Sequence, residues 1–177
     1  QQRNAPQHTV SLLLAADFRR SGFVVESCLQ LASLSKGPVG LVPLARPLAP
    51  DLFDPPFRLC SAVRDALDGQ RLFQVCPGES VSTPLLILPD PEALLELPDP
   101  MPALSAERVR LLAYHSPVTT LAGSGRRLTR YEPATCETSA RKFTSGPLEW
   151  WGRDRSVKRG LIAAGAHGVA RKCIPFT

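Results

Sequence analysis

The chain has 177 residues, a hydrophobic fraction of 44% and a formal net charge of +5. This length provides one core and an extension and leaves too little chain for two full domains. No window approaches the roughly 18–20 apolar residues of a membrane span, and 18 prolines argue against long helices or a large regular sheet.

The first part of the chain predicts alternating strands and helices. Val10–Ala16 is a nearly continuous apolar run, typical of a strand buried on both faces. In Gly22–Ser35 apolar residues recur at three- and four-residue spacing, which predicts an amphipathic helix. Val39–Leu44 then resumes as a strand, and the three elements together have the size of a compact α/β unit.

Prolines interrupt the segment that follows. Residues 46–57 contain four prolines, which predicts a surface loop. Three elements are expected after it: a short helix that ends at Asp68-Gly69, a strand over Arg71–Cys76 and an apolar run over Thr83–Leu88.

Residues 89–102 repeat a Pro-Asp-Pro theme, which indicates a stiff connector. Ser105 is a good N-cap, and Val109 and Leu112 can share a helix face, so we expect a helix over Ala106–His115. The globular part is then expected to end near Gly123.

Charge is divided unevenly between the two ends of the chain. Residues 1–123 carry ten Lys and Arg against twelve Asp and Glu, whereas residues 124–177 carry eleven bases against four acids. Few apolar positions in this last part are periodic. We therefore expect a basic extension that takes its shape from a negatively charged neighbour, because alone it could not bury enough apolar surface to offset its ordering.

These features predict three regions: an N-terminal arm (residues 1–8), an α/β globular domain (9–122) and a basic C-terminal extension (123–177). The predicted fold class is α/β or α+β, with a compact ferredoxin-like core or a similar small sandwich and a long, largely irregular extension.

Cysteines and histidines show no metal or catalytic pattern. The five cysteines are odd in number, widely spaced and without a C-x-x-C pair, which favours free, buried thiols in a reducing compartment. His8, His115 and His167 lie far apart in sequence. We predict no catalytic residue, metal or cofactor, although Cys60 or Cys76 could act as a nucleophile beside a base.

Residues 10–44 resemble the opening of the tenth small-subunit ribosomal protein family. The matching pieces are Ala15-Ala16-Asp17-Phe18, the helix after Arg19-Arg20, and Gly37-Pro38-Val39-Gly40-Leu41-Val42-Pro43-Leu44. The Gly-Pro stretch has extra residues before its later proline, and the family's downstream Ser-Pro-His segment is absent. The resemblance implies a ferredoxin-like βαββαβ core and a place in a ribosomal small subunit.

The sequence thus favours a non-enzymatic, RNA-associated structural subunit of a mitochondrial ribosome. It would lie in the mitochondrial matrix after removal of a targeting peptide, contact rRNA and neighbouring subunits, and not form a free homo-oligomer. Guanidinium groups suit phosphates, and flat aromatic faces suit unstacked bases. The expected RNA-binding residues are Arg126, Arg127, Arg130, Arg141, Lys142, Arg153, Arg155, Lys158, Arg159, Arg171 and Lys172. The expected anchors to a partner or to the core are Tyr131, Phe143, Trp150 and Trp151.

Two alternatives stay open from the sequence. The same basic extension would suit a structural subunit of a mitochondrial respiratory or ATP synthase complex, on acidic protein or anionic lipid. A small enzyme with a Cys or Ser nucleophile is the third hypothesis.

Overall fold

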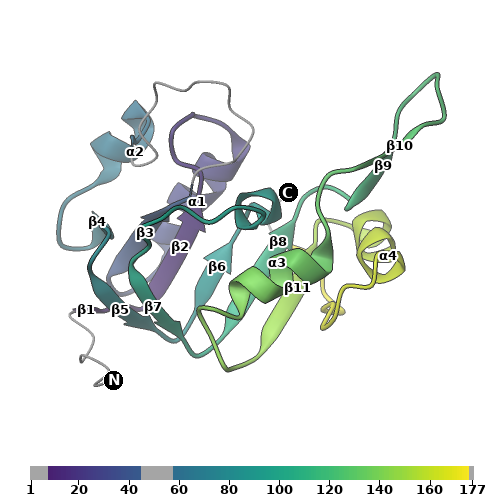
Figure 1. Ribbon diagram of the computed structural model, residues 1–177. Helices are drawn as coiled ribbons and strands as arrows, with labels where there is room; N and C mark the ends of the chain where they lie inside the picture. Colours follow the sequence, from purple (N-terminus) through teal and green to yellow (C-terminus); the bar gives the residue numbers. More distant parts are fainter. Residues whose placement is uncertain (1–7, 45–57, 176–177) are drawn as a thin grey trace.

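A parallel sheet of six strands forms the centre of the computed structural model, which describes residues 8–44 and 58–175 (Figure 1). The predicted loop at 46–57 lies outside these ranges, and so do residues 1–7 of the predicted arm (1–8). In chain order the strands are β2 (Leu12–Ala16), β3 (Val39–Pro43), β4 (Leu72–Gln74), β6 (Leu86–Leu88), β8 (Val109–Ala113) and β11 (Leu148–Gly152).

The spatial order of this sheet is β11-β8-β6-β2-β3-β4, and every neighbouring pair is parallel. Numbered along the chain, the order is 6-5-4-1-2-3, which is that of the doubly wound, Rossmann-type α/β fold. The chain starts at β2, moves outward to β4, then returns to β6 on the other side of β2. The point where the strand order reverses therefore lies between β2 and β6.

Helices cover the two faces of the sheet separately. On one face, α1 (Phe23–Leu34) and α2 (Ser61–Ala66) pack with Leu12, Leu14 and Ala16 of β2. On the other face, η1 (Pro91–Leu94), α3 (Pro133–Ala140) and α4 (Arg155–Ala163) pack with Leu13 and Ala15. Burial of β2 on both faces is the reason for its uninterrupted apolar sequence.

Glycine allows close packing at the centre of the sheet. A Cβ atom on Gly40 of β3 would lie 2.7 Å from Cδ2 of Leu13 and 3.0 Å from Cγ2 of Val75. A side chain at this position would displace Leu13 of β2 and Val75, which follows β4.

A second, smaller sheet continues the central strands at their amino ends. It consists of β1 (His8–Thr9), β5 (Ser80–Thr83) and β7 (Ala103–Ala106), in the order β1-β5-β7. Each strand directly precedes one of β2, β6 and β8. Between β5 and β6, Pro84 has no N–H to donate, and the Thr83 hydroxyl bonds both the N–H and the carbonyl of Leu85.

An antiparallel hairpin of β9 (Val118–Thr120) and β10 (Arg127–Thr129) projects from the body after β8 (Figure 1). It belongs to the long connection from β8 to β11, which also contains α3.

The prediction of an irregular extension over residues 123–177 is wrong. Strand β11 pairs with β8 over its whole length, and α3 and α4 pack onto the sheet. Trp150 is fully buried in this core and Leu161 of α4 with it. The central sheet therefore includes a strand from beyond the boundary expected at residue 123. The apolar residues of 123–177 pack in the chain's own core rather than against a partner.

Two further fold predictions are wrong. A ferredoxin-like core would need antiparallel strands, whereas the central sheet is parallel throughout. The helix expected at Ala106–His115 is strand β8, since this segment is an inner strand paired with β6 and β11. The α/β class is confirmed, and no helix in the described ranges has the length and apolar character to cross a membrane.

Candidate functional site

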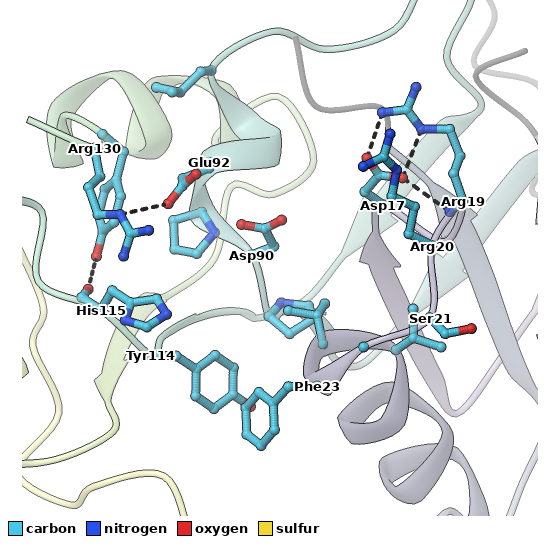
Figure 2. Close-up of a pocket in the computed structure, with 17 residues that line it drawn as sticks. Asp17, Arg19, Arg20, Ser21, Phe23, Asp90, Glu92, Tyr114, His115 and Arg130 are labelled. Carbon is cyan, nitrogen blue, oxygen red and sulfur yellow. Dashed lines mark hydrogen bonds and ion pairs between the residues drawn. The ribbon is translucent and has the colours of Figure 1, made fainter. Parts of the chain in front are cut away.

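A cavity of about 560 Å³ opens at the carboxyl edge of the central sheet (Figure 2). Its lining comes from the segments that follow β2, β6 and β8, together with the first turn of α1 and the residues after β10. The cavity thus spans the reversal point between β2 and β6. In doubly wound sheets this is where ligands bind, and the volume lies in the usual range of about 300–1,000 Å³ for small-molecule sites.

The loop from β2 to α1 contributes an ion pair to one side of the cavity. The Arg19 guanidinium donates to both oxygens of Asp17, at 2.9 and 2.7 Å, and the Arg19 backbone N–H donates to the same carboxylate. Phe18 between them is buried and fixes the loop on the core. The exposed Arg20 follows and also lines the cavity. Figure 2 shows both guanidinium groups beside the Asp17 carboxylate.

The N-terminus of α1 opens onto this same side. Ser21 to Val25 line the cavity, and no side chain of the described residues caps the helix at Gly22. The first N–H groups of a helix have no acceptor within the helix, and the helix dipole favours negative charge there. This end of α1 and Arg20 together form a region suited to an anionic group.

The opposite side of the cavity carries carboxylates and a second arginine. Asp90 follows β6, is 4% exposed and lines the cavity at the N-terminus of η1. Two residues further on, Glu92 pairs with Arg130, with 3.5 Å between Oε1 and Nε. Figure 2 shows Asp90 between this pair and the Asp17–Arg19 pair. Carboxylates here can accept hydrogen bonds from hydroxyl groups of a ligand.

Aromatic rings form the remaining wall. Phe23 and Tyr114 meet edge to face, with their centroids 4.7 Å apart, and Phe23 is 52% exposed. Tyr131 donates its hydroxyl to the carbonyl of His115 at 2.7 Å and stacks on Trp150. Burial raises the pKa of both tyrosines, so they stay neutral at physiological pH. An exposed ring beside polar groups gives the cavity one apolar surface.

The loop from β2 to α1 differs from a dinucleotide-binding turn. That turn has the pattern G-x-G-x-x-G, in which glycines let the backbone approach a pyrophosphate. Here Asp17–Gly22 contains one glycine, at its last position. Phe18 and Arg19 stand just after the strand, where the dinucleotide-binding pattern has its first glycines. Any phosphate at this site would therefore meet side-chain guanidinium groups rather than a glycine cradle.

The residues predicted to bind RNA are spread over several elements. Arg126, Arg127 and Arg130 lie on or next to the hairpin, and Arg141 and Lys142 end α3. The others belong to the segments before, on and after α4: Arg153, Arg155, Lys158, Arg159, Arg171 and Lys172. All are exposed except the half-exposed Lys158, and only Arg130 reaches the cavity.

The predicted aromatic anchors pack mostly on the chain's own core. Tyr131, Phe143 and Trp150 are buried there. Trp151 is half-buried, with the Arg110 guanidinium 4.8 Å from its ring centroid. Their faces are therefore largely occupied within the chain.

All five cysteines are free, as predicted, but only Cys28 and Cys136 are buried. Cys60 caps α2 and Cys76 follows β4, and neither lines the cavity. His115 lines the cavity, whereas His8 lies near Glu79 and His167 contacts Glu137. No group of three or more metal-ligating side chains occurs among residues 8–44 and 58–175.

Of the site residues predicted from the sequence, only Arg130 and Tyr131 line this cavity, and they were predicted for other roles. A local signal existed in Arg19-Arg20-Ser21-Gly22, which stands between a buried strand and a helix. The contributions of Asp90, Glu92 and Tyr114 depend on strand order, which local patterns do not reveal. Searches of family models, of curated proteins and of solved structures each found no match to this chain.

Proposed function

We propose that this chain is a ligand-binding α/β domain of a group-transfer enzyme and that its carboxyl-edge cavity takes a phosphorylated small molecule of mononucleotide size. The observation that carries the proposal is the position of the cavity, between β2 and β6, where the strand order reverses.

The distribution of chemistry around the cavity supports a ligand with two different ends. Arg20 and the N-terminus of α1 suit a phosphate, and they lie on one side. Asp90 and Glu92 lie on the other side and suit the hydroxyl groups of a sugar. The exposed ring of Phe23 offers a flat apolar surface to a base or a sugar. A nucleotide or a sugar phosphate has all three features.

Side chains that can transfer protons support the enzyme part of the proposal. The cavity lining includes His115 as well as the carboxylates of Asp90 and Glu92. Imidazole and carboxylate groups are the usual general acids and bases. A bound phosphorylated group would thus lie within the same cavity as candidate proton donors and acceptors.

The test is calorimetric titration of the chain with nucleoside monophosphates, nucleoside diphosphates, their sugar conjugates, sugar phosphates and NAD. We expect a mononucleotide or sugar-phosphate ligand to bind and NAD to bind more weakly. Arg20→Ala should weaken binding about tenfold or more, since a charge-assisted hydrogen bond contributes about 1.5–3 kcal/mol. The matched control is Arg64→Ala, because Arg64 is exposed on α2 and does not line the cavity.

Equal weakening by both arginine variants, or no binding by any of these ligands, would contradict the proposal. The RNA-associated ribosomal subunit stays a separate prediction. That prediction assumed that the last third of the chain cannot bury apolar surface against its own domain. Trp150 and Leu161, however, are buried in the core.

A further inference from the structure

The β9–β10 hairpin has no apolar core of its own. All residues from 119 to 130 are exposed, including Leu121 at 43% and Leu128 at 50%. An isolated two-stranded hairpin in water is marginally stable. The hairpin therefore presents apolar side chains that nothing in the described part of the chain covers.

Register places the two leucines on one face. Leu128 pairs with Thr119, and the Leu121 N–H donates to the Arg126 carbonyl at 2.8 Å. Since residues alternate between the faces of a strand, Thr119, Leu121, Arg126 and Leu128 share one side. Arg127 projects from the other side, next to the tip. The tip thus combines two exposed leucines with two arginines.

The hairpin carries Arg126 and Arg127 and no acidic residue, although Arg110 and Arg130, on either side of it in the sequence, pair with Glu149 and Glu92. No Asp or Glu occurs between Glu107 and Glu132, whereas this stretch holds five arginines. Helix α4 adds the exposed Arg155, Arg159 and Ile162 at the same end of the molecule (Figure 1). Glycine at position 160 lets α4 lie directly against Ser116, at the base of the hairpin.

We propose that the hairpin and α4 bind the surface of an anionic lipid bilayer, with Leu121 and Leu128 inserted at the level of the headgroups. Such a surface offers negative charge and apolar material in the same place. Peripheral segments bind it through buried apolar area and electrostatic attraction together.

Two observations favour lipid over RNA. The phosphates of a nucleic acid make no favourable contact with exposed leucines. The bases of single-stranded RNA stack on accessible aromatic rings. Tyr131, Phe143 and Trp150 are buried in the core and do not offer such faces. The proposal does not depend on the ligand of the cavity.

The test is co-sedimentation of the 177-residue chain with two kinds of vesicle, phosphatidylcholine alone and phosphatidylcholine with one third phosphatidylserine. We expect binding to the anionic vesicles only, and less of it as salt rises. The double variant Arg126→Gln/Arg127→Gln should lower the partition coefficient about tenfold or more. Leu121→Ser/Leu128→Ser should lower it several-fold at unchanged charge.

The matched control is Arg141→Gln/Lys142→Gln, which removes two exposed neighbouring bases at the end of α3, away from the hairpin. It should retain most of the binding. No retention on anionic vesicles, or equal losses from the two charge variants, would overturn the proposal. The proposal would also be overturned if the chain bound a single-stranded RNA or an acidic protein but showed no detectable binding to vesicles. It would be overturned as well if the leucine variant bound the anionic vesicles as strongly as the wild type.

Discussion

Replacement of Trp150 by alanine is the sharpest test of the claim that the last third of the chain belongs to the core. Trp150 has no exposed surface, stacks on Tyr131 with centroids 6.0 Å apart, and donates its indole N–H to Glu137 at 2.9 Å. The substitution removes the largest fully buried side chain of strand β11.

The expected cost is about 3–5 kcal/mol, as for other aromatic-to-alanine changes in protein cores. The Glu137 carboxylate adds little to this cost, because it keeps the His167 backbone N–H at 2.8 Å. Domains have total stabilities of about 5–15 kcal/mol, so the variant would lose a large share. At about 2–4 °C per kcal/mol for this chain length, the melting temperature should fall by about 10 °C.

The assay is urea unfolding followed by far-ultraviolet circular dichroism. The neighbouring Trp151→Ala is the matched control, since Trp151 is half-buried and packs its ring beside Arg110. We expect the control to lose about 1 kcal/mol. If both variants lost the same small amount, residues 124–177 would not be part of the cooperative fold, and the reasoning would be refuted.

Two further predictions concern titratable groups. Burial raises the pKa of Cys28 and of Cys136 to about 12, so a thiol reagent at pH 8 should label neither cysteine until the protein unfolds. Peptide mass mapping checks this, and rapid labelling of either cysteine in the native protein would contradict its burial. Asp154 accepts the N–H groups of Ser156 and Val157 at 2.9 Å as N-cap of α4, and the Val157 bond, together with Arg153, lowers its pKa. Because this pKa is lower in the folded state, the cap stabilises the protein above about pH 4 and loses its effect as the pH falls through the folded value. Wild type should therefore lose more stability between pH 5 and pH 3 than Asp154→Asn in urea unfolding, and equal losses would exclude the charge effect.

The sequence predicted local elements well where a single pattern dominated. The apolar run at Val10–Ala16 is β2 with its approach, and the helix expected at Gly22–Ser35 is α1. In each of these elements the spacing of the apolar residues matches the faces that are buried, so the local sequence was enough to predict it. The strand expected at Arg71–Cys76 is β4, for the same reason.

Long-range pairing explains what the sequence did not reveal. Val109 and Leu112 fit a helix spacing, but they lie in a strand whose neighbours β6 and β11 are more than 20 and 30 residues away. The alternation in Leu148–Gly152 was hidden by the adjacent tryptophans, one inward and one half-exposed. The cavity combines loops from three strands, so its residues become neighbours only when the strand order is known.

Strand β11 stands at the border of the central sheet, yet its backbone is not left open. Residues 168–170 lie along it: the Trp150 N–H donates to the Gly168 carbonyl at 3.0 Å, and the Ala170 N–H donates to the Trp150 carbonyl at 2.8 Å. Open borders of this kind recruit strands from other molecules. Residues 168–170 therefore shield this edge, and a chain without them would expose the backbone of β11 to pairing with strands of other molecules, which favours aggregation.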